Sequence, residues 1–226
     1  LSTVMPYVNK QMLIGHHLGL KGKLSTLLEQ EDEKAIALND LVNSLYDDLN
    51  NSNYNISGVY RFFPAQSDGN KVLVYNPDNQ NEVLEEFTFP RQATAPFLCL
   101  ADYVKPVSSG EMDYVAFFVV TAGKGIRARS LIFKENGEFL KSHAIQSVAL
   151  ETAEGFAERM HQIIRDKWGI ADDIEMTMKD RFAAKYIGQR FSFGYPACPN
   201  LEDQEKLFRL LKPEDISSIL CLLLIS

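Results

Sequence analysis

One short segment holds most of the residues whose types and spacing could do chemistry. It is "YIGQRFSFGYPACPN", residues 186–200, with one arginine, four aromatic residues, two glycines, two prolines and one cysteine. Arg190 can grip a carboxylate through two parallel hydrogen bonds, because its guanidinium presents its donors in a fixed fork. Tyr195 offers a π-face that could lie against a cation or a flat ring system. The pair therefore suits a zwitterionic, partly flat ligand that carries a carboxylate.

The backbone of this segment is expected to form an extended, low-entropy ribbon. Pro196 and Pro199 fix their own φ and push the residues before them into extended conformations. Gly194 allows a positive φ, or lets a ligand approach the main chain closely. The residues alone leave an alternative open, which is a buried loop of proline and aromatic residues in which Arg190 forms a structural ion pair.

Cys198 raises the question of nucleophilic catalysis. A cysteine nucleophile needs a base, and the histidines available are His16, His17, His143 and His161. No family-specific signature surrounds the cysteine, and its place between alanine and proline favours inert packing. We therefore predict no catalytic residue.

Three further patterns have ordinary structural explanations. Glu151, Glu154 and Glu158 have three- and four-residue spacings that, taken alone, favour the solvated face of a helix. "TAGKG", residues 121–125, lacks the full phosphate-loop pattern and predicts a turn from a strand to a helix. The adjacent histidines at 16 and 17 make a poor metal pair, so no metal site is predicted.

The first element expected from the hydrophobic period is one long amphipathic helix. Apolar residues recur at three- and four-residue steps from Leu27 to Leu49, and Ser25 stands where an N-cap would. The acidic run "EQEDEK", residues 29–34, would lie on the outer face of this helix. Turn-forming residues 50–55 would end it.

The middle of the chain predicts strands, and the remainder predicts helices again. "SGVYRFFPA", "KVLVYNP" and "EVLEEFTFP" indicate an antiparallel meander; "FLCLADYV" and "DYVAFFVVTAG" follow, the latter as a central strand. A long helix is expected over 138–168, and a last helix, "LEDQEKLFRLL", would be capped by Asn200. The fold class is therefore α+β, a single domain with a central, mainly antiparallel twisted sheet flanked by long helices.

Composition restricts the partners and the cellular compartment that can be expected for this protein. The chain has 226 residues, 46% of them hydrophobic, and a net charge of −7, which disfavours a nucleic-acid partner. Cys99, Cys198 and Cys221 form no CxxC pair, so a reducing cytoplasm is expected rather than a disulfide framework. The start shows no signal peptide, and the apolar residues 217–226 are too few for a membrane span, which needs roughly 20.

The segment "RFSFGYPACPNLEDQEKLFRLLKPEDI" resembles the R-x-x-x-G-Y-P-A-C-P signature of the activation domain of cobalamin-dependent methionine synthase. The resemblance extends from about Pro6 to Ile216, in the same order, through "PYVNKQMLIGHHLGLKG", "GVYRFFPAQSDGNKVLVY", "FLCLADYVKP", "DYVAFFVVTAG" and "ALETAEGFAERMHQIIR". It implies binding of S-adenosylmethionine, whose methyl group is presented to the cobalamin of a neighbouring domain. It also implies a flavodoxin-type electron donor for the reductive methylation of cob(II)alamin.

The resemblance also implies roles for residues of the motif. Arg190 matches the family arginine that holds the ligand carboxylate. Ser192 stands where the family commonly has alanine, whose main chain contacts the ligand. Gly194 and Tyr195 match outright, and the tyrosine would lie near both the ligand and the corrin.

Two residues outside the motif complete the expected S-adenosylmethionine site. Asn9 falls where many members have an aspartate that binds the ligand, so a negative charge is absent there. Glu154 matches a helix glutamate that faces the site.

The end of the chain departs from the family pattern. After Ile216 the family continues with further ligand contacts and a last strand, whereas this chain has "SSILCLLLIS". We expect a foreign or prematurely ended terminus that leaves a strand position empty and exposes an apolar edge. Two alternatives stay open: a separate subunit for a split methionine synthase or another corrinoid protein, and a non-functional remnant.

Overall fold

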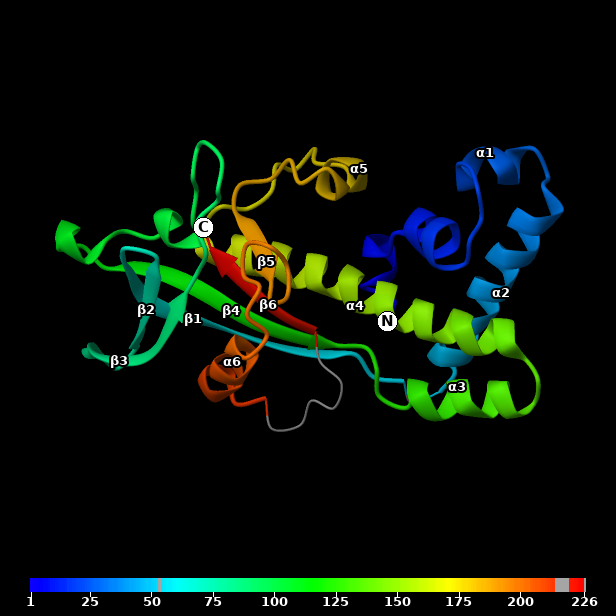
Figure 1. The fold of residues 1–226 in the computed structure, drawn as a ribbon. Coiled ribbons are helices and arrows are strands. Elements are labelled where there is room, and N and C mark those ends of the chain that lie inside the picture. Colours follow the sequence, from blue (N-terminus) through cyan, green and yellow to red (C-terminus); the bar gives the residue numbers. More distant parts are fainter. Residues whose placement is uncertain (53, 214–219, 226) are drawn as a thin grey trace. The chain divides into compact units, whose positions relative to one another are not determined.

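The computed structural model describes residues 1–52 and 54–213 and the backbone of 220–225 (Figure 1). The fold is α+β, as the sequence predicts. The chain divides into two compact units. We name residues 1–57 and 120–159 the helical unit, and residues 58–119, 160–213 and 220–225 the sheet unit, and describe each by itself. The prediction of a single domain over residues 1–226 stays a prediction.

The helical unit is built from three short N-terminal helices and three longer ones. Its elements are η1 (Met5–Tyr7), the π-type helix η2 (Gln11–His17), α1 (Leu24–Glu29), α2 (Glu33–Asn50), α3 (Ile126–Glu135) and the first part of α4 (Phe139–Trp168). Their apolar faces form one buried cluster, because leucines and valines recur at helical spacing. Its members include Leu13, Ile14, Leu38, Val42, Leu45, Leu49, Ile145 and Val148.

The prediction of one helix with Ser25 at its N-cap is wrong. Ser25 lies inside α1, and the chain turns at Glu31, which has a φ of 55°. Asp32 is the N-cap of α2, since its side chain accepts a hydrogen bond of 2.8 Å from the backbone N–H of Ala35. An aspartate is among the strongest N-cap residues, so a new helix begins there. The run "EQEDEK" is therefore a junction between two helices rather than the outer face of one.

The sheet has six strands in the order β3-β2-β1-β4-β6-β5. They are β1 (Ser57–Asp68), β2 (Lys71–Asn76), β3 (Asn79–Thr88), β4 (Asp113–Thr121), β5 (Gln189–Ser192) and β6 (Leu220–Ile225). The pairs β1–β2, β2–β3 and β5–β6 are antiparallel. The predicted meander and the central strand "DYVAFFVVT" are confirmed, and β4 is buried along most of its length.

The strand position that we expected to be empty is filled. Residues 220–225 form β6 between β4 and β5, with Arg190 opposite Leu224 and Ser192 opposite Leu222. The continuous apolar run "LCLLLI" is typical of a strand that has a neighbour on each side. The expectation of an exposed edge there is therefore wrong. Residues 214–219 and 226, which belong to the same predicted tail, lie outside the described residues.

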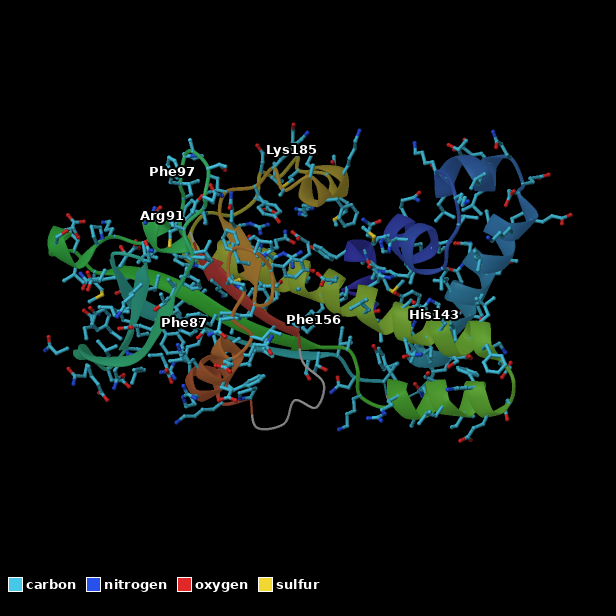
Figure 2. The ribbon with its side chains drawn as sticks, viewed as in Figure 1. Phe87, Arg91, Phe97, His143, Phe156 and Lys185 are labelled. Carbon is cyan, nitrogen blue, oxygen red and sulfur yellow. The ribbon has the colours of Figure 1, made fainter. Side chains whose placement is uncertain are left out.

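An aromatic cluster forms the core of the sheet unit. Phe117 on β4 lies 5.2 Å from Phe87 on β3 and 5.9 Å from Phe63 on β1, measured between ring centroids. Phe193, which follows β5, stacks on Phe87 at 5.9 Å. Phe87 is labelled in Figure 2. The cluster thus ties the end of β5 to three other strands of the sheet.

Short helices complete the sheet unit. They are η3 (Leu100–Tyr103), η4 (Val107–Ser109), α5 (Met178–Phe182) and α6 (Asp203–Leu211). The segment "FLCLADYV" therefore contains a helical turn, which Asp102 stabilises by accepting from the Cys99 N–H. Asn200 is not the cap of α6 as predicted, because its side chain accepts from Glu202 N and the helix starts at Asp203. No helix among the described residues is both long and apolar enough to cross a membrane.

Candidate functional site

The strand β5 carries Arg190 and Ser192 of the predicted site. Side chains alternate along a strand, so these two residues share one face, and Gln189 and Phe191 share the other. β5 is an edge strand, and its neighbour in the sheet order is β6. Arg190 is half-buried, which leaves its guanidinium close to the surface of the sheet unit.

The segment after β5 folds back on itself instead of running on as an extended ribbon. The Gly194 N–H donates to the Cys198 carbonyl and the Cys198 N–H donates to the Tyr195 carbonyl, both at 2.9 Å. The Tyr195 N–H donates to the Ser192 carbonyl at 3.3 Å. The prediction of an extended ribbon is therefore wrong, since proline with its fixed φ also suits a tight turn.

This turn presents Tyr195 and requires Gly194. The tyrosine is 64% exposed, so its ring is open to a ligand or a partner surface. Gly194 has a φ of 97°, which favours glycine, and a Cβ there would lie 2.9 Å from Leu201 Cδ2. We name residues 192–198 the motif turn. The structure brings Arg190, Ser192, Gly194 and Tyr195 together in the sheet unit.

Cys198 supports the motif turn and has the properties of an inert thiol. It is buried, and its Sγ donates to the Ser192 carbonyl at 2.9 Å. Burial, aided by the negative charge of Asp203, raises the pKa of the Cys198 thiol to about 11. Thiolate is the nucleophilic form, so the geometry favours packing over catalysis.

The alkylation of Cys198 tests this role. We expect iodoacetamide to modify it much more slowly at pH 8 in the folded protein than in guanidinium chloride, because a pKa raised to about 11 leaves the thiol protonated there. Peptide mass spectrometry would follow this cysteine separately from the others. Equal rates in the folded and unfolded chains would show that the thiol is reactive and exposed.

Asn9 and Glu154 belong to the helical unit. The side-chain oxygen of Asn9 accepts from the Met12 N–H at 3.0 Å and so caps the start of η2. A Cβ at Gly155, the residue after Glu154, would lie 3.1 Å from backbone atoms of Tyr7 and Val8. The segment before Asn9 therefore packs directly on α4 beside Glu154, which places the two predicted site residues in one region of this unit.

The glutamates of α4 are not the solvated face that their spacing suggests. Glu151 and Glu158 are buried, and Glu154 is half-buried. Glu151 Oε1 lies 2.8 Å from His17 Nε2, and burial raises the pKa of Glu151 while that hydrogen bond opposes the shift. His143 contacts the carbonyl of His17 at 2.9 Å. The histidines at 17 and 143 thus hold η2 on α4 within the helical unit.

Sequence reasoning missed a cluster that lies just before β5 in the sheet unit. It consists of His161 and Arg165 on α4, Asp172 after that helix, and Tyr186 before β5. Burial, with the positive charges of Arg165 and Arg190, lowers the pKa of His161 to about 2, so the imidazole is neutral. The one available signal was the four-residue spacing of His161 and Arg165 on a predicted helix.

The described part of the chain holds no group of three or more His, Cys, Asp or Glu side chains placed to bind a metal ion. The motif turn offers main-chain groups, the Ser192 hydroxyl and one phenol ring, and β5 before it carries the Arg190 guanidinium. Such a set can bind and orient an organic ligand.

Comparisons with known proteins agree with this arrangement. Residues 1–220 match a sequence model described as "Vitamin B12 dependent methionine synthase, activation domain". The methionine synthase of Mycobacterium tuberculosis is 37% identical over 172 residues, and that of Mycobacterium leprae 36% over 173. Each match covers 70% of this chain and 14% of the relative, so the chain spans a small part of their length.

A solved structure extends the similarity to the whole fold. It is a crystal structure of the MetH reactivation domain bound to AdoHcy, with a TM-score of 0.89 and 26% sequence identity. The match covers 100% of this chain and 75% of that one. From the motif turn, the fold and these matches together, the chain belongs to the family of activation domains of vitamin B12 dependent methionine synthases.

Proposed function

We propose that this chain binds S-adenosylmethionine and presents its methyl group for the reductive methylation of cob(II)alamin. The observation that carries the proposal is the placement of Arg190 on β5 beside the motif turn, in a fold whose solved relative is bound to AdoHcy. AdoHcy is S-adenosylmethionine without the transferred methyl group. A site that holds one therefore has the parts needed to hold the other.

Each ligand-binding residue assigned to the sheet unit has a role that the family resemblance implies and that its chemistry suits. Arg190 binds the α-carboxylate of the ligand through charge-assisted hydrogen bonds. The main chain from Ser192 to Gly194 contacts the adenosine part, where the absence of a Cβ on the glycine permits close approach. The exposed ring of Tyr195 lies against the ligand and against the flat corrin of the partner.

In this reaction the chain has only to position the methyl group of the bound ligand. The sulfonium of S-adenosylmethionine already carries an activated methyl group, so holding it near the acceptor supplies the effect of proximity. A protonated Cys198 fits a site in which no thiolate acts as a nucleophile. The cobalamin supplies the methyl acceptor and is carried by another domain or subunit, and a flavodoxin-type donor supplies the electron.

Asn9 and Glu154 enter the proposal through the family resemblance. Each is assigned a contact with the polar and cationic side of the ligand. Separate Asn9→Ala and Glu154→Gln variants measure these contributions. Lower affinity in either variant, with an unchanged circular dichroism spectrum, supports the assignment of that residue.

Isothermal titration of the purified chain with S-adenosylmethionine tests the proposal. We expect saturable binding by the wild type and affinity weaker by about 10- to 100-fold in Arg190→Ala, because hydrogen bonds to the carboxylate are lost. Lys185→Ala is the matched control, since it removes an exposed positive charge of the same unit whose partner is Asp180. Absence of binding by a well-folded wild type would overturn the assignment of this ligand.

A further inference from the structure

We propose that Arg165 and Tyr186 are positioning residues that hold the start of β5, and with it Arg190, in the orientation that binds the ligand carboxylate. This inference rests on the proposed function and deepens it. Neither residue needs to touch the ligand. Both act through the backbone that leads into β5.

The guanidinium of Arg165 is fixed in position by Asp172. The arginine side chain is 0% exposed and the carboxylate 3% exposed. Arg165 Nε and Nη2 donate to Asp172 Oδ1 at 2.9 and 2.7 Å, and Nη2 also donates to Oδ2 at 2.9 Å. Arg181 from α5 donates to the same carboxylate at 2.9 Å. A planar group held at several donors has little freedom to rotate.

The face of this fixed guanidinium lies on Tyr186. The guanidinium carbon is 3.9 Å from the centroid of the tyrosine ring, well within the range of a cation–π contact. The ring of His161 meets the same tyrosine edge-on at 4.9 Å. Tyr186 is therefore packed against two residues of α4, one turn of helix apart.

The stem of Arg165 lies beside the chain closer to the strand. A Cβ built on Gly188 would lie 3.9 Å from Arg165 Cδ and 3.6 Å from Ile170 Cδ1, so a side chain larger than that of glycine at this position would press on the Arg165 stem. Arg165 thus contacts Tyr186, four residues before Arg190, and lies next to Gly188, two residues before it. One side chain, fixed at its head by Asp172, therefore borders the path of residues 186–188.

The pairing of β5 within the sheet is not enough to fix the orientation of this strand. β5 is four residues long and lies at the edge of the sheet, so strand pairing holds it along one side. Its C-terminal end is anchored by Phe193 in the aromatic cluster. Its N-terminal end follows directly on the segment that Arg165 and Tyr186 hold.

A pair of ligands separates a positioning role from a general structural one. S-adenosylmethionine carries the α-carboxylate, and decarboxylated S-adenosylmethionine lacks it. If Tyr186 acts through Arg190, Tyr186→Leu weakens binding of the first by about tenfold, as expected for a misaligned charge-assisted contact, and leaves binding of the second unchanged. Isothermal titration measures both ligands with the wild type and with Tyr186→Leu.

A double-mutant cycle provides the second readout. In the Arg190→Ala background, Tyr186→Leu should cause no further loss of affinity for S-adenosylmethionine, since the group that it positions is gone. Arg165→Lys keeps the charge but loses the fork, and is expected to reproduce the selective loss if Tyr186→Leu does not fold.

The outcomes distinguish this inference from the proposed function. Equal weakening of both ligands by Tyr186→Leu, or additive losses in the cycle, would overturn the positioning role. The positioning role would also be overturned if Tyr186→Leu and Arg165→Lys both kept the wild-type preference for S-adenosylmethionine over its decarboxylated form, while Arg190→Ala had lost that preference. Failure of the folded wild type to bind S-adenosylmethionine would instead overturn the proposed function, and the inference with it.

Discussion

Replacement of Asp172 by asparagine is expected to lower the free energy of unfolding by about 3–5 kcal/mol, which would make it one of the most damaging single changes in the chain. Asp172 is the carboxylate partner of Arg165, whose side chain is 0% exposed. The variant leaves the guanidinium buried without its compensating charge. Removing one partner of a buried ion pair is far more costly than exchanging both for apolar residues.

Urea denaturation followed by the fluorescence of Trp168 measures this effect. Trp168 is the single tryptophan of the chain, and it packs edge-on against Phe62 at 5.0 Å, so it reports on the sheet unit. Asp173→Asn is the matched control, because Asp173 is the exposed neighbour. A loss below about 1 kcal/mol in Asp172→Asn would mean that solvent reaches Arg165 and that the pair behaves as a surface salt bridge.

The second large effect is expected for Phe117→Ala, which should destabilise the sheet unit by about 3–5 kcal/mol. Phe117 is 0% exposed, and its ring packs against those of Phe63 and Phe87. Truncation removes the apolar surface of the ring and leaves a cavity in the middle of the sheet. Neighbouring strands cannot close such a cavity without shifting the sheet register.

The same denaturation experiment applies to Phe117→Ala. Phe182→Ala is the matched control, because that ring is 48% exposed on α5 and its truncation should change stability by less than about 0.5 kcal/mol. Similar losses in both variants would show that the aromatic cluster is not the stabilising core of this unit.

The strands and the long helix could be predicted because their signals are local. Alternation and β-branched or aromatic residues mark β1 to β4, and α4 is expected because no breaker other than Gly155 interrupts its period. The turn at "TAGKG" is confirmed, with Gly125 as the residue before α3. These features depend on neighbours a few positions apart.

The wrong predictions arose where competing local signals or distant contacts decide the structure. Ser25 and Asp32 both suit an N-cap, and the choice depends on how η2 and α2 pack. The prediction of an empty strand position rests on the departure of residues 217–226 from the family pattern. The apolar pattern of these residues alone suits a strand, and residues 220–225 form one.

The candidate site was predicted in part. The chemistry of Arg190 and Tyr195 was visible in the motif, but the backbone that holds them was not. The contacts of Arg165 reach Tyr186 across 21 positions of sequence, and no periodicity reports on such a distance. The fold of the motif turn likewise depends on which donors find acceptors within it. The Cys198 thiol, for example, donates to the Ser192 carbonyl.

The internal hydrogen bonds of the motif turn also affect the time course of binding. Gly194, Tyr195 and Cys198 already have their backbone N–H groups satisfied within the turn, so the turn itself is formed before a ligand arrives. A preformed surface lowers the entropic cost of association, and the observed rate then rises linearly with ligand concentration. Differences in affinity among variants of this turn would consequently appear in how long the ligand stays rather than in how fast it arrives.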